Sequence, residues 1–152
     1  MKGATGVRVS QLIDGSSSKS EARPRGRKVL IVDDEAEIRS LIAMALQEEG
    51  YEVVVAPHGA AALSLVEREH PDVILLDLRM PVMDGWQFAR TYHARPGPHA
   101  PIIVITAARS ARESARPINA AAVLDKPFDL DDLLAAVQRV AADWQAPSAR
   151  AR

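Results

Sequence analysis

The chain has 152 residues, of which 47% are hydrophobic, and its formal net charge is −1 at pH 7. This length suits one domain with tails, and so small a net charge favours neither nucleic acid nor a membrane surface as a partner. The sequence has no cysteine, no apolar run near the ~20 residues of a membrane span and no secretory signal, so disulfides and thiolate metal sites are excluded and the cytoplasm is the expected location.

Residues 1–27 are expected to form a flexible tail, because serine, glycine and proline recur there without helical or strand periodicity. The end of this tail is basic, which suits either a solvated leader or a docking arm for an acidic partner. Residues 28–144 are expected to form the folded domain. Residues 145–152 form a C-terminal tail that is too short to fold alone.

Beyond the tail, apolar runs of strand length alternate with segments of helical periodicity. The predicted strands are 28–33, 51–55, 73–76, 102–105 and 121–124. The predicted helices are 35–49, 59–69, a third from about 84 to before Pro96, a short fourth at 109–116, and 129–144. Gly50 and Pro71 are natural stops for the first two helices.

The first, third and fourth predicted strands are apolar throughout, which is typical of parallel strands covered on both faces. Five strands alternating with five helices imply right-handed crossovers and a doubly wound α/β sheet. In such sheets ligands bind at the carboxyl ends of the strands, where the winding reverses.

Polar side chains follow four of these strands. Asp33 and Asp34 follow the first strand, Asp77 the third, Thr106 ends the fourth, and Lys126 follows the fifth. Clustered carboxylates repel one another and are stable in the ionised form only when a cation compensates them. Carboxylate oxygens are hard ligands that favour Mg²⁺, Mn²⁺ or Ca²⁺ over zinc.

The same set of side chains suits phosphoryl transfer. A carboxylate is a competent nucleophile and gives an aspartyl phosphate. The transferred group then needs its oxygens neutralised, and Mg²⁺, the Lys126 ammonium and the Thr106 hydroxyl would each serve one of them. The spacing alone does not say which acid is the nucleophile.

Taken together, these residues resemble the receiver domain of two-component response regulators, of the stand-alone chemotaxis type. The resemblance covers about residues 28–144 and rests on motifs that occur in family order and near family spacing. Those motifs are Val32-Asp33-Asp34-Glu35, Asp77 with Met80-Pro81 and Asp84-Gly85, Thr106-Ala107, and Lys126-Pro127-Phe128. The family fold is flavodoxin-like, with strand order 2-1-3-4-5.

The resemblance implies a role for each acid at the strand ends. Asp77 corresponds to the phosphoacceptor. Asp33 and Asp34 correspond to the acid pair that holds Mg²⁺, for which Mn²⁺ is a substitute. Asp77 itself and the backbone carbonyl of Arg79 would complete the protein's share of the coordination.

It also implies roles for the last two strands. Thr106 corresponds to the switch hydroxyl that moves toward the phosphoryl group, and Lys126 to the phosphate-binding lysine. The Lys126-Pro127 peptide bond is expected to be cis, as it is in the family, although cis bonds are generally uncommon.

The segment between Thr106 and Lys126 departs from the family pattern. It is slightly shorter than receivers commonly show, and Pro117 cannot continue a helix interior, so helix four should be short or broken. Asn119 stands where receivers usually carry glycine, and asparagine is the best substitute if that residue is left-handed.

Two further departures concern signalling. Val123 stands where the family usually has tyrosine or phenylalanine, so the signal leaves the domain without the usual threonine–aromatic coupling, or Val123 is simply a core residue. Arg79 is a long cation beside the expected acyl phosphate, which it would shield from water, or it is an exposed loop arginine.

The leading functional prediction is a single-domain response regulator. It would accept a phosphoryl group on Asp77 from a histidine kinase or phosphotransfer protein, either as a diffusible regulator or within a phosphorelay, and signal by contact with a downstream protein that the sequence does not identify. It would catalyse only its own Mg²⁺-dependent phosphorylation and dephosphorylation. Two alternatives stay open: a constitutive protein-interaction module that phosphate does not switch, and a metal-dependent phosphatase acting on external substrates.

Overall fold

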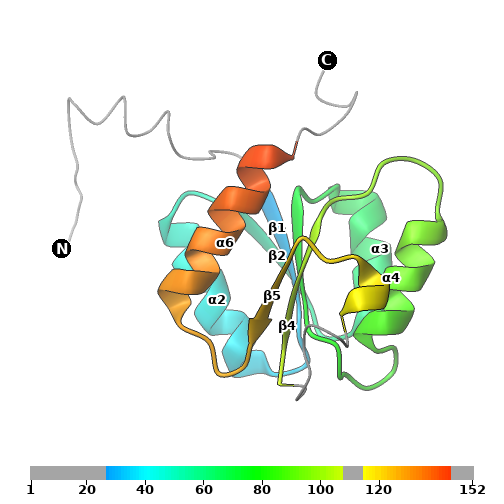
Figure 1. Ribbon diagram of the computed structural model, residues 1–152, viewed down its shortest axis with the longest axis horizontal. Helices are drawn as coiled ribbons and strands as arrows, with labels where there is room; N and C mark the ends of the chain where they lie inside the picture. The colour runs from blue at the N-terminus through cyan, green and yellow to red at the C-terminus, as the bar shows by residue number, and fades with distance from the viewer. Residues whose placement is uncertain (1–26, 108–114, 145–152) are drawn as a thin grey trace.

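The computed structural model describes residues 27–107 and 115–144. Its centre is a five-stranded sheet in the order β2-β1-β3-β4-β5, and all four strand pairings are parallel (Figure 1). The predicted doubly wound order 2-1-3-4-5 is therefore confirmed. The strands are β1 (Lys28–Val32), β2 (Glu52–Ala56), β3 (Val73–Leu76), β4 (Ile102–Thr106) and β5 (Ala122–Asp125).

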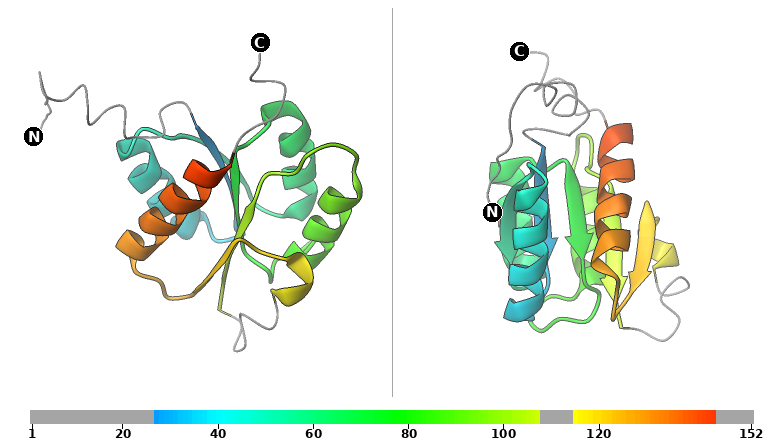
Figure 2. Two further views of the ribbon diagram at one scale, coloured as in Figure 1. Left: turned by 45° about the horizontal axis from the view of Figure 1, so that its top comes forward. Right: turned by 90° about the vertical axis from the view of Figure 1, so that its left-hand side faces the viewer.

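Helices cover both faces of this sheet (Figures 1 and 2). One face carries α2 (Ala36–Glu48) and α6 (Leu130–Asp143). The other face carries α3 (Gly59–Glu69), α4 (Gly85–Ala94) and the short 3-10 helix η1 (Arg116–Ile118). Within the described ranges there are four α-helices rather than the five predicted, and most of the predicted helix at 109–116 lies outside them.

The core consists of two layers that share the strands. Alternate residues of a strand point to opposite faces, so Leu30 and Ile74 pack against α3 and α4, whereas Val29 and Leu75 pack against α2 and α6. Because both faces are buried, the side chains of β3 and of β1 beyond Lys28 are apolar, and β4 is apolar up to Thr106, its last residue. The polar residues that follow or end these strands therefore lie at the same carboxyl edge of the sheet.

Local signals set most element ends. Gly50, with φ of +99°, follows the C-terminus of α2, and Asn119, with φ of +60°, follows η1, so Asn119 has the left-handed conformation in which asparagine best replaces glycine. Strand β2 begins one residue later than predicted because the Tyr51 N–H donates to the Leu46 carbonyl and so belongs to the helix end.

None of the helices in the described ranges is both long and apolar enough to cross a membrane.

The loop between β3 and α4 contains a strained residue. Val82 has φ of +69°, and the Met83 N–H donates to the Pro81 carbonyl across it at 2.7 Å, which makes a γ-turn of the rare positive-φ kind. Such a conformation is costly for a β-branched residue. Two hydrogen bonds hold the surrounding loop: the Met83 carbonyl accepts from the Gly59 N–H at the start of α3, and the Gly85 N–H donates to the Leu78 carbonyl within the loop.

Replacing Val82 by glycine is expected to raise the free energy of unfolding by about 1 kcal/mol, because glycine adopts positive φ without steric cost. Little packing is lost, since Val82 is 77% exposed. Urea denaturation measures the change. Val55→Gly is the matched control, because Val55 is an exposed valine inside strand β2, where glycine should lower stability by about 1 kcal/mol. Equal effects of the two substitutions would contradict the assignment of strain to Val82.

Candidate functional site

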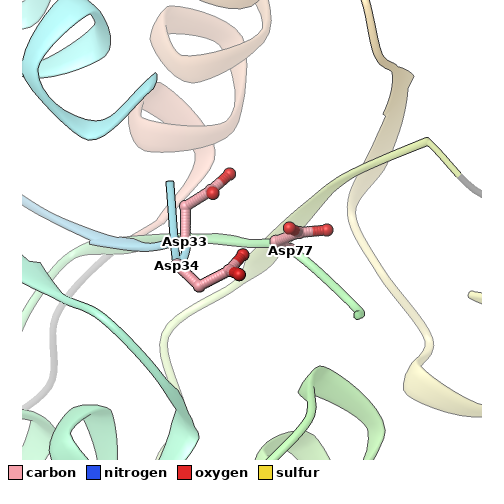
Figure 3. A group of neighbouring side chains, drawn as sticks. All are labelled: Asp33, Asp34 and Asp77. Carbon is pink, nitrogen blue, oxygen red and sulfur yellow. The ribbon is translucent and has the colours of Figure 1, made fainter. Parts of the chain in front are cut away.

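The register of β1 and β3 brings the acids together. The Asp77 N–H donates to the Val32 carbonyl at 2.9 Å, and the Asp33 N–H donates to the Ala56 carbonyl at 3.1 Å, so the ladders on both sides of β1 extend to the residues that follow the strands. Figure 3 shows Asp33 and Asp34 at the end of β1 beside Asp77 at the end of β3. The predicted convergence of the three carboxylates is confirmed.

The three carboxylates form a compact group of oxygen ligands. One oxygen from each of Asp33, Asp34 and Asp77 lies within 4.8 Å of the other two. Asp33 and Asp77 are buried, whereas Asp34 is exposed. An all-oxygen donor set with one side open to solvent fits a hard divalent cation that keeps part of its water shell, as Mg²⁺ does.

Lys126 is the cation that the protein itself supplies. Its Nζ lies 2.8 Å from Asp33 Oδ2, 3.1 Å from Asp77 Oδ2 and 3.0 Å from Glu35 Oε1. The following peptide bond, Lys126-Pro127, is cis as expected. The Lys126 N–H donates to the Thr106 carbonyl at 2.9 Å, which ties the start of this segment to the end of β4.

The pKa values of the site reflect burial first and charge second. Burial raises the pKa of Asp77, and the neighbouring Asp33 charge raises it further, while Lys126 and the Arg79 N–H oppose the change without reversing it. For Lys126, burial alone would lower the pKa, but hydrogen bonds to Asp33 and Glu35 and the charges of Asp77 and Asp33 outweigh it and leave the pKa raised. The ammonium is therefore charged at neutral pH, and ionisation of Asp77 is less favourable than it would be in water.

Glu35 joins this site although the sequence motif gave it no role. It is the N-cap residue of α2, its backbone N–H donates to Asp33 Oδ1 at 2.9 Å, and its side chain makes no capping hydrogen bond. The side chain instead contacts Lys126, which lies 91 positions away in the sequence. The one signal that marked Glu35 was its position as the third consecutive acid after a buried strand.

Thr106 and Arg79 lie at the site in different ways. Thr106 is fully buried at the end of β4, the strand between β3 and β5. The Arg79 backbone N–H donates to the Asp77 carboxylate, whereas its guanidinium carbon lies 5.6 Å from the centre of the Trp86 ring. The exposed Arg79 side chain is thus placed over an aromatic face, a cation–π arrangement.

Gly85 lets the loop after β3 fold back on its own beginning. A Cβ atom at this position would lie 2.5 Å from the Asp77 carbonyl oxygen and 2.8 Å from Leu78 Cα. The preceding residue, Asp84, caps α4 by accepting from the Gln87 N–H, and the Gln87 side chain accepts in return from the Asp84 N–H. The Asp84-Gly85 pair therefore fixes the loop against the backbone of Asp77.

Comparison with known proteins agrees with this geometry. The sequence model of the response regulator receiver domain matches residues 29–138. The transcriptional regulatory protein PdtaR of Mycobacterium tuberculosis is 43% identical over 115 residues, which is 74% of this chain and 55% of PdtaR. The chain thus spans about half the length of this curated relative.

Two solved structures illustrate the likeness in three dimensions. Chemotaxis response regulator CheY4 of Vibrio cholerae is 35% identical with a TM-score of 0.69, over 76% of this chain and 98% of that one. Response regulator TrrA of Thermotoga maritima, in complex with Mg²⁺-BeF, is 33% identical with a TM-score of 0.68, over 75% and 98%. With the family model covering most of the chain, the protein belongs to the response regulators of two-component signalling, through its receiver domain.

Proposed function

We propose that residues 28–144 accept a phosphoryl group on Asp77 from the phosphohistidine of a histidine kinase or phosphotransfer protein. The observation that carries this proposal is the position of the Asp77 carboxylate, which is buried between the two acids that follow β1 and the ammonium of Lys126. The proposal is the same for a separate receiver and for a receiver within a longer chain.

Each residue has a distinct task in the proposed reaction. A carboxylate oxygen of Asp77 forms a bond to phosphorus while the bond from phosphorus to the donor nitrogen breaks, and the electron pair of that bond returns to the imidazole. Lys126 neutralises one phosphoryl oxygen and the Thr106 hydroxyl donates to another. Asp33, Asp34, Asp77 and the Arg79 carbonyl would hold Mg²⁺, for which Mn²⁺ is a substitute. When bound, the cation supplies charge neutralisation for a further oxygen.

Exposed apolar side chains support docking of a protein partner near this site. Leu41 and Met44 lie on α2, whose N-terminus is beside the acids, and Val82 lies in the loop that follows Asp77. All three side chains are about half exposed or more, so a docked partner would remove apolar surface from water. A phosphorylated histidine must reach Asp77 while its carrier contacts the surrounding surface.

The proposed output is contact with a downstream protein. The formal net charge of −1 over the whole chain does not favour nucleic acid as the direct partner. PdtaR is named as a transcriptional regulator, but this chain covers only about half of it, so any effect on transcription would be a property of partners or of further sequence. Val123 is partly buried against the α3–α4 layer and pairs with Val104 in the sheet register. In this proposal it contributes to the output by packing, since valine has no ring to swing.

Incubation with acetyl phosphate and Mg²⁺ is expected to add one phosphoryl group per chain, measured by intact mass spectrometry. Asp77→Asn should abolish the addition because it removes the nucleophile. Asp84→Asn is the matched control, since asparagine also caps helices and this acid lies in the same loop outside the cluster. Equal labelling of parent and Asp77→Asn would rule out Asp77 as the acceptor. A folded parent that gains no mass would favour the module that phosphate does not switch.

The raised pKa of Asp77 also predicts how stability depends on pH without metal. A carboxyl whose pKa is raised on folding contributes stability that is lost as the pH rises through that pKa, so ionised Asp77 destabilises the metal-free fold at neutral pH. Asp77→Asn should therefore raise the free energy of unfolding at neutral pH.

The stability gained by Asp77→Asn should be largest at pH values above the raised pKa of Asp77. It should shrink as the pH falls toward 3.8, the ordinary pKa of an aspartate. Saturating Mg²⁺ should stabilise the parent more than the variant, because the cation binds the folded carboxylates. Thermal denaturation at several pH values, with and without Mg²⁺, measures both effects. A variant less stable than the parent at neutral pH without metal would show that the Lys126 contact outweighs burial and repulsion at Asp77.

A further inference from the structure

The ammonium of Lys126 has all three of its donors matched by carboxylates. Asp33, Glu35 and Asp77 each place an oxygen between 2.8 and 3.1 Å from Nζ. An ammonium has three N–H donors and no acceptor, so a fourth partner is accommodated only when one of the three is given up. A phosphoryl oxygen on Asp77 would be such a fourth partner.

Glu35 differs from the other two partners in two respects. Its side chain is 59% exposed, whereas those of Asp33 and Asp77 are 4% and 7% exposed. It also lies outside the group of three acids whose oxygens are close enough to share a metal ion. Water can replace Lys126 as the partner of Glu35 at little cost, but Asp33 and Asp77 have far less access to water.

The backbone holds Glu35 in reach of Lys126. Its N–H donates to Asp33 Oδ1, and its carbonyl accepts from the Arg39 N–H at 3.0 Å in the first turn of α2. The Arg39 guanidinium donates to the Asp33 carbonyl at 2.7 Å and fixes the same corner. The Glu35 carboxylate is thus directed at the lysine by its neighbours, while its own side chain contributes nothing to capping the helix.

We propose that Glu35 is a positioning residue that holds the Lys126 ammonium in the unphosphorylated protein and competes with the phosphoryl group for it. This inference rests on the proposed phosphorylation of Asp77. On phosphorylation, Lys126 exchanges Glu35 for a phosphoryl oxygen, and Glu35 returns to water. The Glu35 charge also repels an incoming anionic donor. Glu35 therefore sets how readily the site accepts and keeps a phosphoryl group.

Beryllofluoride, which mimics the phosphoryl group on an aspartate, gives a direct test in the presence of Mg²⁺. Glu35→Gln is expected to raise the affinity for beryllofluoride roughly three- to ten-fold, because the competitor loses its charge. Glu37→Gln removes the other acid from the first turn of α2 and should change the affinity less than about two-fold. Glu35→Asp keeps the charge but shortens the reach, so its affinity should lie between those of the parent and Glu35→Gln.

A second measurement needs neither metal nor beryllofluoride. In metal-free protein, a double-mutant cycle of Glu35→Gln and Lys126→Met on the unfolding equilibrium should give a coupling of roughly two- to five-fold, as expected for a partly exposed ion pair. A Glu35 that acted only through helix α2 would give no coupling to Lys126.

The outcomes separate this inference from the proposed function. If the parent binds beryllofluoride at Asp77 and Glu35→Gln binds it equally or more weakly, Glu35 does not compete with the phosphoryl group for Lys126. The proposed phosphorylation of Asp77 is unaffected by that result. If the parent binds no beryllofluoride at all, both are overturned. Tighter binding by Glu35→Gln, with coupling to Lys126 in the metal-free cycle, supports the exchange of partners.

Discussion

The mutual repulsion of carboxylates at one edge of the sheet is the constraint on which this site depends. Asp33, Asp34 and Asp77 converge because parallel strands β1 and β3 end side by side, and two of the three acids are buried. Lys126 compensates part of this charge, and Glu35 adds a further negative group at the rim. The protein therefore keeps a locally unfavourable charge balance, which a divalent cation and a phosphoryl group would together rearrange.

The fold supports this arrangement from several separate segments. Lys126 follows β5, at the opposite end of the sheet order from β2, and its side chain reaches past the end of β4 to Asp77 after β3. Contacts in the loop after β3 also join residues distant in sequence, since the Gly59 N–H at the start of α3 donates to the Met83 carbonyl. Strain at Val82 persists because this contact holds Met83 and the hydrogen bond from Gly85 to Leu78 closes the loop around the turn.

Much of the fold was predictable because its signals are local. Continuous apolar runs mark buried parallel strands, and helix α3 and strand β3 have the predicted bounds. The polar residues at the ends of the predicted strands then indicated the acids, the threonine and the lysine of the candidate site. Asn119 and the cis bond before Pro127 also matched expectation.

Three features could not be predicted from the sequence, because each depends on contacts that form only in the folded chain. The pairing of Glu35 with Lys126 follows from how the corner between β1 and α2 sits against the end of β5, and no spacing in the sequence reports that distance. The positive φ of Val82 arises from loop closure against two helices, whereas valine itself favours extended backbone. The start of β2 shifted because the hydrogen bond from Tyr51 to Leu46 belongs to a helix end.

In the proposed function, the acid cluster becomes a switch only when Asp77 carries a phosphoryl group beside a bound cation. Amide NMR spectra with Mg²⁺, recorded before and after adding beryllofluoride, test it most directly when parent and Asp77→Asn are compared. We expect shifts that start at the carboxyl edge of the sheet, spread over one surface, and require Asp77. A folded parent whose spectrum is unchanged by beryllofluoride would contradict it.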